Sequence, residues 1–165
     1  MKKTKWKKIM FLISEDLIDI NYFALDKASC LNDMIQLLHE QDIIQSQQNF
    51  SAKLWEREKM MPTGIGRHIA IPHARSSSVR ELALAFFRLK NDLDFDAIDD
   101  EPVKFIFMIA IPENMSNDYM QLLKAISNFC HSPENLERLK AAEKKSEVKS
   151  ILESITNSIQ TNQEK

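Results

Sequence analysis

Apolar residues recur at helical spacing in the first third of the chain. Intervals of three and four positions, the period of one helix face, separate Ala28, Leu31, Ile35 and Leu38. This spacing predicts an amphipathic helix over about residues 26–41. Ser46 is of a residue type that caps helix N-termini, and it predicts a second helix that runs to about residue 60.

The middle of the chain holds three apolar runs with the character of strands. The short run over residues 69–71, Ile-Ala-Ile, ends at Pro72. Residues 81–89 and 103–111 form longer runs that are apolar at both alternating positions. A strand that is apolar on both pleat faces needs cover on both sides, so we expect these two strands at the centre of a covered sheet.

Three further helices are predicted in the last third of the chain. The first is marked by apolar positions at Leu122, Leu123, Ile126, Phe129 and Cys130. Ser132 and Pro133 open the second, as cap and first-turn proline. The third, which we expect Ser146 to cap, is marked by Val148, Ile151, Leu152, Ile155 and Ile159.

Together these elements indicate an α/β fold with three layers, α/β/α. We expect a central mixed sheet of about four or five strands flanked by helices. The chain has 165 residues, of which 44% are hydrophobic, and this is enough for one domain with a real core but not for two. The expected organisation is a basic tail over residues 1–11, a single domain over 12–160 and a frayed end over 161–165.

Charge and hydropathy exclude several function classes. The formal net charge is −2, whereas nucleic-acid binders usually show a broad basic excess. Five lysines among the first eight residues are a local exception, which we interpret as a solvated tail. No apolar run approaches the roughly 20 residues of a membrane span. We therefore expect neither nucleic-acid binding nor membrane insertion.

The two cysteines point to a reducing compartment. Cys30 and Cys130 are far apart in the sequence, and each lies within an apolar helical pattern. Buried free thiols of this kind are typical of cytoplasmic proteins. We expect a cytoplasmic protein without a disulfide.

The segment from Pro62 to Arg75, PTGIGRHIAIPHAR, carries the candidate chemistry. It contains the only two glycines of the chain, Gly64 and Gly66. Two glycines so close together can present successive amide N–H groups to an anion. Pro72 stiffens the backbone ahead of His73, whose neutral imidazole is a competent nucleophile at neutral pH. The alternative is a tight turn followed by a histidine that only forms hydrogen bonds.

This segment closely resembles the signature of the type-2 enzyme IIA (EIIA) domains of the bacterial phosphoenolpyruvate:sugar phosphotransferase system (PTS). The signature of this fructose/mannitol and nitrogen-regulatory family is close to T-G-I-G-x-G-I-A-I-P-H, preceded by an Arg-Glu pair. Arg57 and Glu58 stand in the place of that pair. The resemblance continues through residues 93–113 and 122–129, and it covers roughly residues 12–158.

The resemblance implies specific roles. The phosphorylated histidine of the family falls on His73, which would accept a phosphoryl group from the histidine-containing phosphocarrier protein. The resemblance places the family's phosphate-stabilising arginine at Arg57. This fits the chemistry, since a guanidinium binds phosphate oxygens in a bidentate way. No metal or cofactor is required. The surrounding loop backbone would close on the phosphate at Thr63, Gly64, Ile65 and Gly66.

Two positions depart from the family pattern. His68 stands where the family usually has a third glycine, and Tyr119 where it has a second histidine. Together with Glu58, they are candidate auxiliary residues. Positions five apart in an extended segment face opposite ways, which argues against cooperation between His68 and His73 and against a zinc pair. The Tyr119 phenol offers either a hydrogen bond to His73 or to phosphate, or ordinary packing at the edge of the core.

These features leave three functions open. We expect a stand-alone, nitrogen-regulatory-type IIA protein that signals through its phosphorylation state, because the chain carries no IIB or membrane-embedded IIC segment. The first alternative is the IIA component of a fructose/mannitol-type sugar uptake relay. The second is a degenerate IIA domain that acts only as a protein-binding module. The expected partners are the phosphocarrier protein and either a IIB-type acceptor or a regulated target protein.

Overall fold

The computed structural model describes residues 11–115 and 119–162. The predicted basic tail and frayed end lie largely outside these residues. A short 3-10 helix, η1 (Glu15–Leu17), leads into the first strand. The other helices are α1 (Lys27–Glu40), α2 (Gln47–Met60), α3 (Tyr119–Cys130), α4 (Pro133–Ala141) and α5 (Lys145–Asn162). The strands are β1 (Ile18–Tyr22), β2 (Gly64–Gly66), β3 (Ile69–Ala70), β4 (His73–Ser76), β5 (Ala83–Leu93) and β6 (Val103–Pro112).

The described strands form one mixed sheet of six strands. The order is β1-β5-β6-β3-β2, and β4 also pairs with β6, beyond the end of β3. Strands β3 and β4 both run parallel to β6, whereas β5 runs antiparallel to it. The chain therefore follows β6 twice, once through β3 and again through β4, and the second passage begins at His73.

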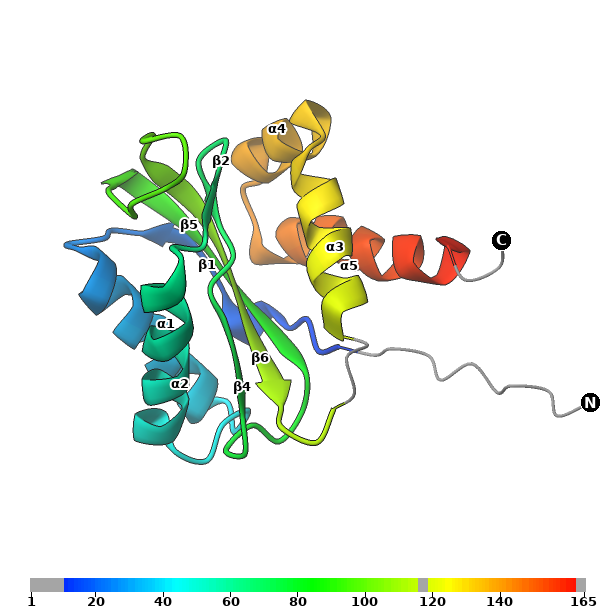
Figure 1. Ribbon diagram of the computed structural model, residues 1–165. Coiled ribbons are helices and arrows are strands. Elements are labelled where there is room, and N and C mark those ends of the chain that lie inside the picture. The colour runs from blue at the N-terminus through cyan, green and yellow to red at the C-terminus, as the bar shows by residue number, and fades with distance from the viewer. Residues whose placement is uncertain (1–10, 116–118, 163–165) are drawn as a thin grey trace, which may run out of the picture.

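Helices cover both faces of the sheet. Figure 1 shows α1 and α2 on one face and α3, α4 and α5 on the other. The alternating residues of the two central strands divide accordingly. Phe87 and Ile106 pack into the cluster on the α1 side, whereas Phe86 and Phe107 pack into the cluster on the α5 side. Burial of both pleat faces is what the apolar runs predicted, and the α/β fold is confirmed.

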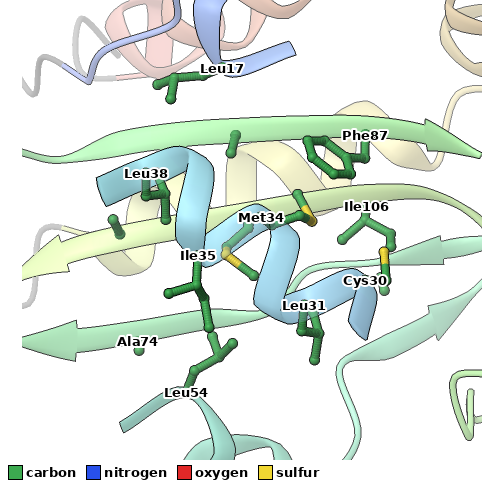
Figure 2. Close-up of a cluster of buried hydrophobic side chains, with 14 of the residues drawn as sticks. Leu17, Cys30, Leu31, Met34, Ile35, Leu38, Leu54, Ala74, Phe87 and Ile106 are labelled. Atoms are coloured by element: carbon green, nitrogen blue, oxygen red, sulfur yellow. The ribbon is translucent and has the colours of Figure 1, made fainter. Parts of the chain in front are cut away.

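One amphipathic stripe of α1 packs into the core on that side of the sheet. Cys30, Leu31, Met34, Ile35 and Leu38 are all buried along α1. Figure 2 shows their side chains between α1 and the sheet, with Leu54 of α2 joining them. Cys130 lies buried in the opposite cluster, so the two free thiols belong to different layers.

Most predicted helix boundaries are confirmed by the side chains that cap them. The Ser46 hydroxyl accepts a hydrogen bond from the Asn49 N–H at 3.1 Å, and α2 begins at the next residue. The Ser132 hydroxyl caps α4, with Pro133 in the first turn. Each serine satisfies a backbone donor that the first turn of a helix leaves without a partner.

The prediction that Ser146 caps the last helix is wrong. Helix α5 begins at Lys145, so Ser146 lies within its first turn. The Lys144 carbonyl already accepts from the N–H groups of Glu147 and Val148. The Glu147 carboxylate reaches back to the Glu143 N–H at 2.9 Å, so it holds the segment that leads into the helix.

Strands β1, β2 and β4 were not predicted, so the sheet has six strands instead of four or five. Strand β2 has three residues, too few for an alternating pattern. Strand β4, His-Ala-Arg-Ser, is mostly polar. Pairing with β6 holds β4 extended, so tertiary contact rather than local propensity decides its structure.

The two serines offer a matched test of helix capping. Ser46→Ala should lower the free energy of unfolding by about 1 kcal/mol, because the N–H of Asn49 loses its acceptor. Ser146→Ala should change it by less than about 0.5 kcal/mol, since alanine is the better helix former at an exposed first-turn position. Urea unfolding of both variants measures the difference. Equal losses would contradict the observed start of α5.

Candidate active site

His73 is held at the start of β4 by backbone contacts on both sides. The Pro72 carbonyl accepts a hydrogen bond from the Ile109 N–H at 3.0 Å, and His73 itself pairs with Ile109 in register. The imidazole is half-buried, and its Nδ1 lies 2.8 Å from the Ile71 carbonyl oxygen. A carbonyl can only accept, so Nδ1 carries the proton in the neutral ring. The free lone pair is then on Nε2.

The surroundings of His73 favour its neutral form. Burial lowers the pKa of the ring below its usual value, and the positive charge of Arg57 lowers it further. The Ile71 hydrogen bond and the negative charge of Glu58 act in the opposite direction but do not reverse the shift. A neutral imidazole with one nitrogen fixed and the other free is the form that acts as a nucleophile.

A cavity of about 480 Å³ opens beside His73. It is lined by residues of α2, β4, β6 and α3. Arg57, in the last turn of α2, is one of them, and its Nη1 donates to the Met61 carbonyl at 2.7 Å. This bond fixes the guanidinium beside the cavity. The structure therefore brings together His73 and Arg57, the two residues that the sequence predicted as catalytic.

Arg75 also lines this cavity and was not predicted. It lies two positions beyond His73 in the same strand, and residues two apart share one face. Its Nε donates to the Glu113 carbonyl at 2.9 Å and its Nη2 to the Met115 carbonyl at 2.6 Å. In the sequence Pro-His-Ala-Arg, the histidine and the arginine are two positions apart, which places them on one face of a strand. That inference requires β4 to be a strand, which the sequence did not predict.

Tyr119 reaches the same cavity from the first turn of α3. Its ring centre lies 5.7 Å from the Arg75 guanidinium carbon, within the range of a cation–π contact. The side chain is half-buried and also packs against the core on the α5 side. Tyr119, which stands at the position of the family's second histidine, therefore contacts and stabilises the Arg75 guanidinium.

Glu58 belongs to a buried polar network and does not line the cavity. Its side chain is only 2% exposed, and its Oε1 pairs with the Lys27 ammonium at 2.8 Å. The same carboxylate accepts from the Thr63 N–H at 3.0 Å and from the Thr63 hydroxyl at 2.7 Å. This network joins α1, α2 and the residue that precedes β2, and it leaves neither Glu58 nor Thr63 among the residues that line the cavity.

The network continues through the backbone to the histidine. The Thr63 carbonyl accepts from the Ile71 N–H at 3.0 Å, and the Ile71 carbonyl holds Nδ1 of His73. One short chain of hydrogen bonds therefore runs from the buried ion pair to the imidazole. The side chains of Thr63 and Glu58 are thus linked to the site through this chain of hydrogen bonds and do not line the cavity.

The glycine segment lies outside the lining of the cavity beside His73. Gly64, Ile65 and Gly66 make up β2, which pairs with β3, and none of the three lines the cavity. A Cβ on Gly64 would lie 2.8 Å from both Cα and Cβ of Ala97. Gly66 has φ of +90° and opens the turn into β3. Close packing and turn geometry therefore explain both glycines.

His68 is not part of this site. It lies in the β2–β3 turn with φ of +66°, and its Nδ1 is 2.7 Å from the Pro102 carbonyl. It lines a different cavity, described below. The separation of His68 from His73 agrees with the argument from spacing against their cooperation.

No metal site is evident in the described part of the chain. Residues 11–115 and 119–162 contain no group of three or more His, Cys, Asp or Glu side chains that could hold a metal ion. Over the same residues, no helix combines the length and apolar character needed to cross a membrane.

Comparison with known proteins assigns the family. The family model described as "Phosphoenolpyruvate-dependent sugar phosphotransferase system, EIIA 2" matches residues 11–155. The chain belongs to this family. Its EIIA domains take a phosphoryl group on a histidine and transfer it, which agrees with a fixed, neutral histidine beside two arginines. The resemblance seen in the sequence is confirmed.

The EIIA chain has both sugar-specific and regulatory relatives. It is 40% identical to the fructose-specific EIIA component of Haloferax volcanii over 99 residues, 60% of this chain and 64% of that protein. It is 32% identical to the nitrogen regulatory protein of Klebsiella oxytoca over 128 residues, 76% and 78% of the two chains. The match to the fructose-specific EIIABC component of Bacillus subtilis covers 88% of this chain but 23% of that protein, at 30% identity. The chain therefore spans less than two thirds of both fructose-specific relatives.

Solved EIIA structures share the fold. The nitrogen regulatory protein IIA-Ntr from Neisseria meningitidis superimposes with a TM-score of 0.79 at 28% identity, covering 84% of this chain and 94% of that one. The mannitol IIA of Escherichia coli has a TM-score of 0.73 at 21% identity, over 86% and 99% of the two chains.

Substitution of Gly64 separates a packing role from a phosphate-binding one. Gly64→Ala should lower the free energy of unfolding by about 1–3 kcal/mol, because the new methyl group meets the backbone of Ala97. The folded variant should still accept a phosphoryl group at close to the normal rate. Urea unfolding and labelling under native conditions measure the two effects. A variant with normal stability that no longer accepts a phosphoryl group would instead indicate that Gly64 helps to bind phosphate.

Burial of His73 should make stability depend on pH. The native ring resists protonation, so between the unfolded pKa of about 6.5 and the lower native value the unfolded chain binds more protons. The stability associated with neutral His73 is present above pH 6.5 and is lost as the pH falls through the native pKa. Wild type should therefore lose more unfolding free energy than His73→Gln between pH 7.5 and 5.5. Equal losses would show that burial does not shift the ring.

Proposed function

We propose that this EIIA chain is a phosphocarrier that accepts a phosphoryl group on Nε2 of His73 from the histidine-containing phosphocarrier protein. The supporting observation is the state of the ring: Nδ1 is bound to the Ile71 carbonyl, and Arg57 and Arg75 line the same cavity. In the transfer, the Nε2 lone pair forms a bond to phosphorus. The N–P bond of the donor breaks, and its electron pair returns to the donor imidazole.

The chain supplies positioning and charge for this step. The product ring carries phosphate on Nε2 and a proton on Nδ1, and the Ile71 carbonyl stabilises that N–H. The two guanidinium groups offset the negative charge of the phosphoryl oxygens as it passes between histidines. Carbonyl contacts fix both arginines in advance. No metal or cofactor takes part in this proposal.

Arg75 and Tyr119 together replace the second imidazole of the family pattern. A tyrosine cannot carry a positive charge, but its ring face attracts a guanidinium. The pair places a permanent cation at the cavity, whereas a histidine would place one that titrates. Acceptance by His73 therefore does not need an imidazole at position 119.

Within the family, we favour a nitrogen-regulatory type of protein in the cytoplasm, which signals through the phosphorylation state of His73 to a regulated target protein. Support comes from two regulatory relatives, the nitrogen regulatory protein of K. oxytoca at 32% identity and IIA-Ntr of N. meningitidis at 28% identity with a TM-score of 0.79. A fixed cation that holds phosphate firmly suits a stored signal better than rapid onward transfer.

Sugar uptake is the second candidate. The 40% identity to the fructose-specific EIIA component of H. volcanii favours it. In that case the acceptor would be a IIB-type protein. The Tyr119→His variant, which has a second imidazole, should then transfer phosphate to a IIB domain at the same rate as wild type. A variant that transfers phosphate to a IIB domain faster than wild type supports the regulatory assignment instead.

Phosphorylation tests the function directly. Incubation with labelled phosphoenolpyruvate, enzyme I and the phosphocarrier protein should label wild type and leave His73→Ala unlabelled. Arg57→Lys and Arg75→Gln should each slow labelling by about tenfold to a hundredfold, the effect of losing a charge-assisted contact of about 1.5–3 kcal/mol.

Arg80→Gln is the matched control for this experiment. Arg80 is an exposed arginine that follows β4 and lies outside the His73 cavity, so its variant should be labelled at the wild-type rate. Circular dichroism confirms folding of each variant. Unlabelled wild type would leave the binding-module alternative, and label retained by His73→Ala would assign the phosphoryl group to another residue.

A further inference from the structure

A second cavity lies at the opposite end of the sheet from His73. Its volume is about 550 Å³. The β2–β3 turn, the start of β6, residues of β1 and β5, and helix α4 surround it. In Figure 1 this turn and α4 lie at one end of the sheet, and the start of α3, which contributes to the His73 cavity, lies at the other.

Positive charge is concentrated around this second cavity. It is lined by five permanent cations and a single carboxylate, Glu137. The cations are Arg67, Arg88, Lys90, Lys104 and Lys140, and we call the cavity that they line the basic pocket. The chain as a whole has a net charge of −2, so this gathering is a local feature that the overall composition conceals.

Few of these cations are neutralised by the protein. Lys104 pairs with Asp92 at 3.1 Å. Among the described residues, no carboxylate lies within ion-pair distance of the other four. Lys90 and Lys140 are exposed at the rim. A cluster of like charges is unfavourable by itself, and a bound anion would relieve the repulsion.

Arg88 gives the basic pocket a rigid base. Its Nε donates to the Ile20 carbonyl at 2.9 Å, and its Nη1 donates to the Leu139 and Ala142 carbonyls at 2.8 and 2.7 Å. The guanidinium is half-buried where β1, β5 and the end of α4 meet. Arg67 is fixed in a similar way, by the His131 carbonyl at 2.7 Å. Two of the five cations are therefore positioned before any ligand arrives.

Apart from the charged residues, the lining is mostly apolar, with Asn21 and His68 as its polar members. Ile20, Leu89, Phe105 and Leu136 line the cavity beside the cations. The volume lies within the range of about 300–1,000 Å³ that is usual for small-molecule sites. The site combines several fixed or available cations with apolar surface in a concave space, and this combination fits an anionic head group attached to an organic body.

We propose that the basic pocket binds a small organic polyphosphate, a molecule with two or more adjacent phosphate groups and an apolar or aromatic portion. Arg67 and Arg88 bind phosphate oxygens through the guanidinium N–H groups that do not donate to backbone carbonyls. Lys90, Lys104 and Lys140 close around the remaining charge, and Phe105 and Leu136 contact the organic body. The site is separate from His73 and requires no phosphoryl transfer.

Direct binding tests the proposal. Calorimetric titration of the full chain with ADP should give saturable, one-site binding that weakens as salt is added, because counter-ions compete for the cations. Pyrophosphate should bind less tightly than ADP, since it lacks the organic body. Orthophosphate should bind at least about tenfold more weakly than pyrophosphate, having fewer charge-assisted contacts.

Matched variants locate the site. The double variant Lys90→Gln, Lys140→Gln should weaken ADP binding by about tenfold or more, and both side chains are exposed, so folding should be unaffected. Lys59→Gln, an exposed lysine of α2 outside both cavities, should bind ADP as wild type does. Arg57→Gln should also bind normally, which separates this site from the His73 cavity.

Backbone amide spectra of the folded protein provide an independent reading. On addition of ADP, the changes in NMR chemical shift should be largest for the backbone amides of Arg67, Lys90 and Lys104. They should be small for the amide of His73. Absence of saturable binding, or binding that Arg57→Gln abolishes and the double lysine variant does not, would overturn the proposal. So would binding of a polyglutamate peptide, but not of ADP or pyrophosphate, to the same lysines, because the partner would then be an acidic protein segment.

Discussion

The burial of both faces of the central strands is the constraint on which the rest of the structure depends. Over most of their length, strands β5 and β6 carry apolar side chains on both pleat faces, so each face must be covered by helices. With both faces covered, polar chemistry is confined to the ends and edges of the sheet. His73 lies toward one end of β6, and the basic pocket surrounds the beginning of the same strand.

The buried ion pair of Lys27 and Glu58 connects this scaffold to the chemistry. A carboxylate that is 2% exposed needs several partners to offset its lost hydration, and here an ammonium, a backbone N–H and a hydroxyl supply them. Satisfying Glu58 fixes Thr63, and through the backbone it fixes the carbonyl that orients His73. The position of the imidazole is thus set by groups that never reach the cavity.

The sequence predicts the layers and the reactive histidine better than the details of the site. Apolar periodicity is strong in α1 and in the central strands, so their existence could be inferred from neighbouring residues alone. Arg75 was missed because β4 is extended only through its pairing with β6, which no local pattern records. The sequence also could not show why a glycine stands at position 64. A Cβ there would collide with Ala97, which is distant in the sequence and comes close only in the completed fold.

The placement of the two cysteines in opposite layers gives the protein a pair of internal reporters. Burial raises the pKa of each thiol to about 12, and because the thiolate is the reactive species, neither should react while its layer stays closed. Cys30 becomes accessible when α1 separates from the sheet, and Cys130 when α3 does. The rates at which an alkylating reagent modifies the two positions therefore measure the opening of each layer separately, in the natural sequence and without an introduced label.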